Sequence, residues 1–257
     1  AAQEGAKVVL VNPEDYVQHI DFLNKAVYTK NDLSFLKEVA KAVVDSGRGA
    51  GVDGYEEFAA SVKDVTASDD AKAVADMYLE AKKAMIVFNQ NLITTEAASL
   101  LADIALVSGH IGTPRDGILQ VKAKNNSQGL VDLGITAGAE ELEGVKALVV
   151  FGEEADIDTD ALEFLAVSDT HMTALAAKAD VVIPGTGFAS TDGTYTNTER
   201  RLQLVQAAIE EDVELANWEI AAEIAHVFEV DYEWENTEDI SVAMNDEVPA
   251  YKYAVVD

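Results

Sequence analysis

The segment at residues 180–206 strongly limits how this chain can fold. Residues 181–183 form a short β-branched run that Pro184 stops, which is typical of a buried strand that ends in a loop. Glycines and then polar residues follow: Gly185, Gly187, Gly193, Asn197, Glu199 and Arg200. Because ligands meet the carboxyl ends of strands in α/β sheets, this pattern indicates a binding site at such an end. The spacing alone favours an ordinary loop after a strand.

Continuous apolar runs of the same kind recur along the chain and predict further buried strands. The predicted strands are residues 7–11, 84–88, 146–151, 164–168 and 181–183. Helical periodicity separates them and predicts helices at residues 33–43, 55–63, 69–82, 95–108, 171–179 and 217–228. This alternation predicts an α/β fold with mostly parallel sheets and crossover helices, divided into two blocks.

Glycine content suggests where the two blocks meet. Residues 46–54 contain four glycines in nine positions and are the best candidate for a linker. We therefore expect a β/α unit of a partial dinucleotide-type domain, with its linker, at residues 1–54. Residues 55–257 are then a second α/β block with an acidic, weakly structured tail. Within this block, residues 110–135 show little periodicity and predict a long loop, which in compact domains is usually functional or docked on a partner.

Composition excludes several classes of function. Eighteen Lys and Arg against 47 Asp and Glu give a net charge of −29, which disfavours nucleic acid and anionic membranes as partners. The chain has no cysteine, so it can hold neither a thiolate-ligated iron–sulfur cluster nor a disulfide. Its four histidines lack metal-ligand spacing, so we expect no metal site. No apolar run is as long as a membrane span and no secretory signal is visible, so we expect a cytoplasmic protein without direct membrane insertion.

Several motifs occur in an order that is itself informative. Asp-Val-Val-Ile-Pro at residues 180–184 precedes Asp-Gly-Thr-Tyr-Thr-Asn-Thr-Glu-Arg-Arg-Leu-Gln at residues 192–203. The other motifs are Gly5–Pro13, Phe88–Gly112, Asn125–Gly129, Asp132–Gly134, Gly152–Glu153, Asn217–Ile220 and Val248–Tyr251. In this order they resemble the molybdopterin oxidoreductase family, which includes formate dehydrogenase α-subunits and the large iron–sulfur subunit of NADH:quinone oxidoreductase. The resemblance implies the C-terminal part of such a subunit, without the cluster-binding domains.

The chain also departs from the family pattern at two motifs. The family's Asp-Pro-Arg is Asn-Pro-Glu at residues 12–14, and its Gly-Glu-Asn-Pro is Gly-Glu-Glu-Ala at residues 152–155. The first change replaces a phosphate-compatible cation with an anion, and the second replaces an amide with a carboxylate. Like charges near the phosphates of the family's cofactor would cost roughly 4 kcal/mol per pair at close range near a surface. We therefore expect a non-catalytic scaffold, without a cofactor of its own, in the large subunit of an NADH dehydrogenase-type electron-transfer oxidoreductase.

The resemblance implies a second function as an alternative. The chain would then be the cofactor-gripping half of a molybdopterin-dependent formate dehydrogenase-like enzyme and would bind molybdopterin guanine dinucleotide. In both interpretations the expected partners are other subunits or domains that carry iron–sulfur clusters.

Candidate cofactor-binding residues lie in three of the motifs. Uncharged groups that suit a pterin edge, or that cap the loop internally, are Asn125, Asn126, Gln128 and Gly129. Gly152 and Glu153 match the family stretch that faces the guanine nucleotide.

Each remaining candidate has a structural alternative. Asp169 could bind the N1–H and N2–H₂ edge of guanine, or it could cap a helix at residues 171–179. Asn197, Glu199 and Arg200 could form an internal hydrogen-bonded network, and Arg200 is also a candidate phosphate contact. We find no pairing of a nucleophile with a base that suggests catalysis by this chain alone.

Overall fold

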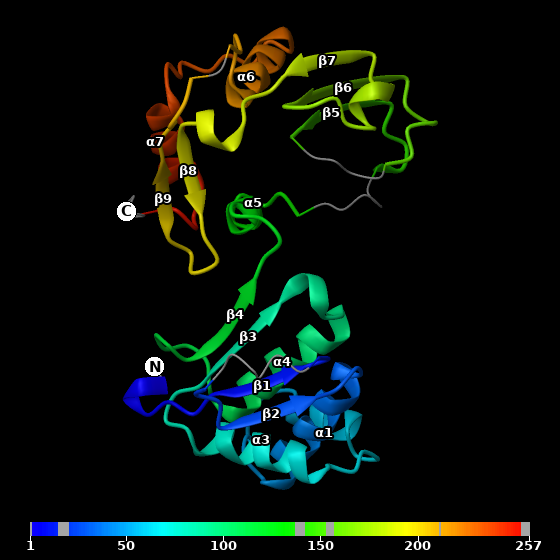
Figure 1. Cartoon of the computed structure of the whole chain (residues 1–257), viewed down its shortest axis with the longest axis vertical. Coiled ribbons are helices and arrows are strands. Elements are labelled where there is room, and N and C mark those ends of the chain that lie inside the picture. The colour runs from blue at the N-terminus through cyan, green and yellow to red at the C-terminus, as the bar shows by residue number, and fades with distance from the viewer. Residues whose placement is uncertain (1, 15–20, 137–141, 153–156, 211, 253–257) are drawn as a thin grey trace. The chain divides into compact units, whose positions relative to one another are not determined.

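The computed structural model describes residues 2–14, 21–136, 142–152, 157–210 and 212–252 (Figure 1). The chain divides into two compact units, residues 1–123 and residues 124–257, which are described separately below. Three of the four sheets in the described residues are parallel, which confirms the predicted α/β class.

Unit 1 contains two parallel strand pairs and four helices. Strands β1 (Val9–Asn12) and β2 (Lys25–Tyr28) pair in the register Val9↔Lys25, and β3 (Met85–Asn89) and β4 (Gly117–Val121) pair in the register Met85↔Gly117. The helices are α1 (Asp32–Asp45), α2 (Tyr55–Ser61), α3 (Asp69–Glu80) and α4 (Thr95–Ser108). Short 3₁₀ turns lie at Ala2–Glu4 and Gln90–Leu92.

Polar caps explain where these helices begin. Side-chain oxygens of Asn31, Ser68 and Thr94 accept hydrogen bonds from backbone N–H groups in the first turns of α1, α3 and α4. Such caps satisfy donors that have no partner inside the helix. At the other end of α4, Gly109 has a φ of 77°, so it forms the left-handed cap that suits glycine.

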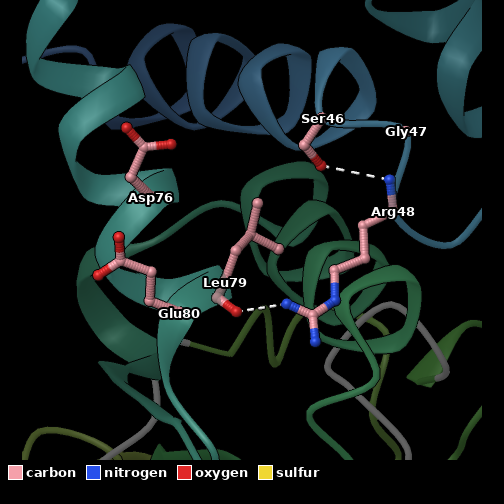
Figure 2. Close-up of a pocket in the computed structure, with 6 residues that line it drawn as sticks. All are labelled: Ser46, Gly47, Arg48, Asp76, Leu79 and Glu80. Atoms are coloured by element: carbon pink, nitrogen blue, oxygen red, sulfur yellow. Dashed lines mark hydrogen bonds between the residues drawn. The ribbon is translucent and has the colours of Figure 1, made fainter.

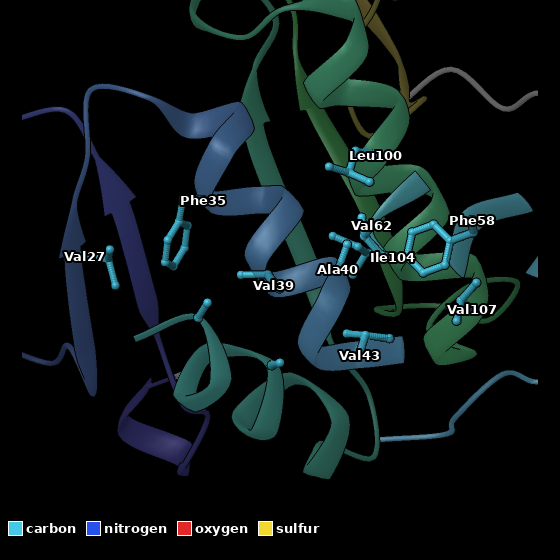
Figure 3. Close-up of a cluster of buried hydrophobic side chains, with 12 residues drawn as sticks. Val27, Phe35, Val39, Ala40, Val43, Phe58, Val62, Leu100, Ile104 and Val107 are labelled. Atoms are coloured by element: carbon cyan, nitrogen blue, oxygen red, sulfur yellow. The ribbon is translucent and has the colours of Figure 1, made fainter. Parts of the chain in front are cut away.

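The core of unit 1 surrounds α1. Figure 3 shows the α1 side chain Phe35 on the side of Val27, and the α4 side chains Leu100, Ile104 and Val107 on the other side of α1. Residues of α2 and α3 complete the buried cluster, including Phe58, which is 6% exposed. Helix α1 is thus surrounded by apolar contacts, as its predicted periodicity requires.

The glycine-rich segment at residues 46–54 lies inside unit 1, so it does not separate the two units as the sequence suggested. Gly49 explains this difference, because a Cβ at this position would lie 2.4 Å from the backbone oxygen of Val107. With a φ of 83°, Gly49 also has a conformation that other residues rarely adopt. The glycines of residues 46–54 therefore allow a turn to pack closely on α4. The division into units falls instead after residue 123.

Unit 2 combines a parallel sheet, a hairpin and three helices. Strands β5 (Ala147–Phe151), β6 (Phe164–Asp169) and β7 (Val181–Pro184) form the sheet, with β6 in the middle (Figure 1). Strands β8 (Gly193–Thr196) and β9 (Leu202–Val205) form an antiparallel hairpin. The helices are α5 (Ser127–Asp132), α6 (Asn217–Val227) and α7 (Thr237–Glu247), with 3₁₀ turns at Ala176–Lys178 and Phe188–Ser190.

Several sequence-based predictions for individual elements were wrong. The helix predicted at residues 171–179 is only a 3₁₀ turn at Ala176–Lys178, which is enough to bury Leu175 and Ala176 against the sheet. The predicted loop at residues 110–135 contains β4 and α5. The tail predicted to be weakly structured contains α7, which begins with a capping box formed by Asn236 and Asp239.

Candidate functional site

Three strands of unit 2 end beside one another and bring together two of the predicted site residues. Phe151 lies opposite Ser168, and Asp169 lies opposite Pro184 in the parallel register. The N–H of Gly152 donates to the Ser168 carbonyl at 2.8 Å, and the N–H of Gly185 donates to the Asp169 carbonyl at 3.0 Å. We call Gly152, Asp169 and Gly185 the strand-end group. It lies where ligands bind in parallel α/β sheets.

Glycines give this group its shape. A Cβ at Gly185 would lie 3.0 Å from the hydroxyl of Ser168, so a larger residue would displace buried atoms. Gly152 has a φ of 59° and open space where a Cβ would be. The Ser168 hydroxyl in turn donates to Asn217 Oδ1 at 2.9 Å, which attaches the first turn of α6 to the end of β6.

Asp169 is a half-buried carboxylate at the centre of the strand-end group. Its Oδ1 accepts the N–H of Thr170 at 2.7 Å, and no described residue donates to its Oδ2. Because no helix spans residues 171–179, the alternative in which Asp169 caps that helix is wrong. Glu153, the predicted neighbour of Gly152, lies outside the described residues.

A second set of predicted residues connects α5 to the β8–β9 hairpin. Asn126 Oδ1 accepts the N–H of Thr196 at 2.9 Å, although the two residues are 70 positions apart. Gly129 makes this contact possible, because a Cβ there would lie 2.4 Å from Asn126 Oδ1. Thr196 is also hydrogen-bonded at 2.6 Å to the hydroxyl of Tyr251, and both residues are buried.

Asp132 links Gln128 to Arg200 in the same region. Gln128 Nε2 donates to Asp132 Oδ1 at 2.8 Å, and Arg200 Nη2 lies 3.7 Å from that same oxygen. The Asp132 side chain is 9% exposed, whereas that of Arg200 is 72% exposed. The guanidinium is therefore attached at one side and accessible at the other. We call Asn126, Gln128, Gly129, Asp132, Thr196 and Arg200 the α5–hairpin group.

Asn197 shapes the tip of the hairpin, which confirms the internal network suggested for this residue. Its Oδ1 accepts the N–H groups of Glu199 and Arg201 at 2.9 and 3.0 Å, and its Nδ2 donates to Gln203 at 3.0 Å. Glu199 contributes only its backbone to this network, and its side chain is exposed. Asn125 is also exposed, and no described residue forms a hydrogen bond with it.

A pocket of about 430 Å³ lies in unit 1, and none of the predicted site residues lines it. Figure 2 shows Arg48 facing Asp76, Leu79 and Glu80 of α3, with Ser46 and Gly47 beside it. The Arg48 guanidinium donates to the Leu79 carbonyl near the end of α3, so it stabilises that helix end. This cation already has a structural role, and we do not consider the pocket a functional site.

Unit 1 also contains a buried polar cluster. His110 Nδ1 lies 2.9 Å from Asp116 Oδ1, and His110 Nε2 lies 3.0 Å from the Tyr78 carbonyl. The N–H of Ala84 lowers the pKa of Asp116, and His110 and Thr113 lower it further, although burial opposes them. Burial and the nearby Asp116 charge raise the pKa of Tyr78 to about 12. These contacts join three segments of unit 1 and involve no predicted site residue.

Comparison with a family model decides the relationship. The model described as molybdopterin oxidoreductase matches residues 3–227. The chain belongs to the molybdopterin oxidoreductase family.

Curated relatives within this family are formate dehydrogenases. Formate dehydrogenase H of Escherichia coli is 23% identical over 93% of this chain and 44% of its own length. The F420-dependent formate dehydrogenase subunit alpha of Methanocaldococcus jannaschii is 24% identical over 98% of this chain and 48% of its own length. The chain therefore spans just under half the length of these two relatives.

A solved structure supports the fold of this molybdopterin oxidoreductase family member. Acetylene hydratase from Pelobacter acetylenicus matches with a TM-score of 0.73 and 12% identity, covering 98% of this chain and 47% of that chain. Within the described residues, no group of three or more potential metal ligands occurs, and no helix is long and apolar enough to cross a membrane.

Three residues that support the two groups were missed as contributors by sequence reasoning. Ser168 forms a hydrogen bond with Asn217 of α6, and Asp132 forms an ion pair with Arg200. Tyr251 forms a hydrogen bond with Thr196. Asp132 and Tyr251 lie in motifs that resemble the family. Nothing local in the sequence connects Tyr251 with Thr196, because the two residues are 55 positions apart.

Proposed function

We propose that this chain is the part of a formate dehydrogenase-like molybdopterin oxidoreductase that holds the guanine nucleotide end of the pterin cofactor. The observation that carries the proposal is Asp169 between Gly152 and Gly185 at the ends of parallel strands. When bound, the cofactor supplies the metal and the redox chemistry. The residues of this chain bind and orient its nucleotide.

The chemistry of the strand-end group fits guanine. Guanine presents two adjacent donors, N1–H and N2–H₂, and an ionised carboxylate is the matching acceptor. Among the described residues, no donor bonds to Oδ2 of Asp169, and Oδ1 accepts only one hydrogen bond, so both oxygens can accept from guanine. Gly152, at the end of the neighbouring strand, has open space where a Cβ would be, since no atom lies within 4 Å of that position.

The α5–hairpin group adds one accessible cation, Arg200. Asn126 and Gln128 direct their side chains to Thr196 and Asp132, so they support the hairpin instead of pointing to a ligand. Arg200 is the candidate for a phosphate, because its guanidinium is mostly exposed. Asn125 and Glu199 are exposed and have no assigned role in this proposal.

The relatives named above favour this function over the NADH dehydrogenase-type scaffold. Both are formate dehydrogenases, and one is a subunit alpha, so partner subunits are part of the proposal. We propose that these partners carry iron–sulfur clusters, because this chain has no cysteine to hold one. A cytoplasmic location is also a proposal.

Analysis of the native protein tests this function. We expect molybdenum or tungsten, pterin and acid-released GMP in constant ratio in the purified full-length protein. Asp169→Asn should lower the GMP content about tenfold or more, because the loss of a charged acceptor costs roughly 1.5–3 kcal/mol. Glu163→Gln is the matched control, because Glu163 lies at the opposite end of β6 and contacts Lys146. Protein without metal, pterin and GMP would overturn the proposal and favour the scaffold.

A further inference from the structure

The segment that connects α6 to α7 has an alternating sequence. Residues 228–235 read Phe-Glu-Val-Asp-Tyr-Glu-Trp-Glu, so apolar and acidic residues alternate over eight positions. We call these residues the alternating segment. In an extended backbone, a period of two places the apolar side chains on one face and the carboxylates on the other.

The apolar residues of the alternating segment are poorly covered. Phe228 is 75% exposed, Tyr232 48% and Val230 44%. The rings of Tyr232 and Trp234 stack with centroids 4.1 Å apart and an interplanar angle of 13°. Stacking between residues two positions apart requires Tyr232 and Trp234 to lie on one face. Phe228 caps the end of α6 and Glu229 has a left-handed φ of 63°, so an extended backbone can begin only at Val230.

The backbone of the alternating segment is open as well. No described residue forms a hydrogen bond with the N–H groups of residues 231–234, and these residues belong to no helix or strand. The ends are fixed: the N–H of Val230 donates to the Ala225 carbonyl, and the N–H of Glu235 donates to Asp239. His226 also contacts Asp231. Fixed ends reduce the conformational entropy that binding would cost.

We propose that the alternating segment is a docking strand that adds to the exposed sheet edge of a basic partner protein. Unpaired donors and acceptors supply the main-chain hydrogen bonds of strand addition, and alternate side chains supply specificity. The apolar face requires an apolar groove, and the carboxylates of Glu229, Asp231, Glu233 and Glu235 require Lys or Arg.

Charge separates this partner from other possible occupants. A second copy of this chain would place the same four carboxylates, within a molecule of net charge −29, against each other. Anionic membranes and nucleic acid are repelled for the same reason. A basic protein surface is attracted, and the attraction should weaken with salt because exposed charges are screened over about 10 Å at 0.1 M.

Peptide binding to the whole chain tests the docking strand. The probe is a dye-labelled octapeptide of alternating Lys and Val, compared with an alternating Glu and Val octapeptide and with a Lys and Val peptide of shuffled order. We expect the alternating basic peptide to bind at least tenfold more tightly than either control in fluorescence anisotropy. In a Trp218→Phe background, binding should also change the fluorescence of Trp234, which is then the only tryptophan.

Proline substitutions identify the edge that is used. In an extended strand, the N–H groups of residues 231 and 233 point to one edge and that of residue 232 points to the other. Proline removes the backbone donor. If the partner pairs with the edge of residues 231 and 233, Asp231→Pro with Glu233→Pro should abolish binding and Tyr232→Pro should have a smaller effect. If it pairs with the other edge, the two effects should be reversed. Because the Asp231 variant also loses contacts with His226 and a carboxylate, Asp231→Asn with Glu233→Gln measures the charge effect separately.

Side-chain variants provide the remaining controls. Val230→Ser with Tyr232→Ser should reduce binding at least tenfold, whereas Val242→Ser, a 61% exposed residue of α7, should not. Circular dichroism checks that each variant is folded. Equal binding of all three peptides, or equal binding to the proline variants, would overturn the proposal. The proposal would also be overturned if sedimentation showed self-association that Val230→Ser removes, because the occupant would then be a second copy of this chain. Flotation with vesicles of neutral lipid would overturn it too, because the occupant would then be a membrane.

Discussion

The two units are stabilised in different ways. Among the described residues, the buried cluster of unit 1 has twelve members and that of unit 2 has five. Unit 2 relies instead on side chains that bind distant backbone or side-chain groups, such as Asn126 with Thr196 and Ser168 with Asn217. Apolar packing therefore holds unit 1, and specific polar contacts hold the unit that contains the candidate site. Such contacts fix positions of loops that a small core cannot fix.

The largest expected effect is the loss of an apolar side chain in unit 1. Phe35→Ala should destabilise unit 1 by about 3–5 kcal/mol, because this α1 side chain is buried in the core and its loss leaves a cavity. Hydrogen exchange followed by mass spectrometry should show faster exchange in residues 21–123 and little change in unit 2. Equal acceleration in both units would contradict the distinction between them.

A smaller loss is expected from the close contact between α5 and the hairpin. Gly129→Ala should cost about 1–3 kcal/mol, because its Cβ must displace Asn126 Oδ1 and release the N–H of Thr196. The measurement is the exchange rate of the Thr196 amide. Gly51→Ala is the matched control, because Gly51 has open space and no positive φ, and should change stability by less than about 0.5 kcal/mol. Slow exchange in Gly129→Ala would show that the hairpin does not depend on Asn126.

Acid should act on unit 1 through Asp116. The folded state lowers the pKa of this carboxyl, so its contribution to stability is present above the unfolded value of about 3.9 and is lost as the pH falls through the folded value. Asp116→Asn should therefore lower the stability of unit 1 at pH 7 and make it less dependent on pH below about 4. Urea unfolding at pH 7 and at pH 3 measures both. An unchanged pH dependence in the variant would show that other carboxyl groups dominate.

The smallest effect at neutral pH is expected at Tyr78. Its hydroxyl is buried and has no hydrogen-bond partner among the described residues, so Tyr78→Phe should leave stability unchanged or raise it by up to about 1 kcal/mol. Because burial and Asp116 raise the folded pKa to about 12, the unfolded phenol ionises first, so the wild-type protein loses stability as the pH rises from about 10 towards 12. The variant should lack this alkaline loss in unfolding experiments between pH 9 and pH 12. A clear loss of stability at pH 7 would mean that the hydroxyl has a partner.

Much of the fold could be predicted because buried parallel strands have a local signature. The five predicted strands correspond to β1, β3, β5, β6 and β7 within one or two residues at each end. Strand β2 was missed because Lys25 and Tyr28 interrupt its apolar run, and β4 because Gln120 does. Helix α7 was missed because its acidic sequence hides a short helix that a capping box begins.

The candidate site was only partly predictable for a related reason. Gly152 and Asp169 could be placed near each other, because the carboxyl ends of neighbouring parallel strands share one edge. The contact between Asn126 and Thr196 could not, because nothing in either neighbourhood specifies a partner 70 residues away. That contact assigns a supporting role to Asn126, a residue whose amide had suggested contact with a pterin.

The long-range hydrogen bonds of unit 2 also set an order for folding during synthesis. All the elements of unit 1 have been made once the ribosome has released residue 123, so this unit can fold while the rest is still being translated. The hairpin can form all its contacts only later, because the hydrogen bond between Thr196 and Tyr251 requires Tyr251 to have emerged from the ribosome. Contacts between residues so far apart form slowly, because closing a long loop costs conformational entropy before the contact can stabilise the chain. The hairpin that carries Arg200, the candidate phosphate contact, should therefore become ordered later than unit 1.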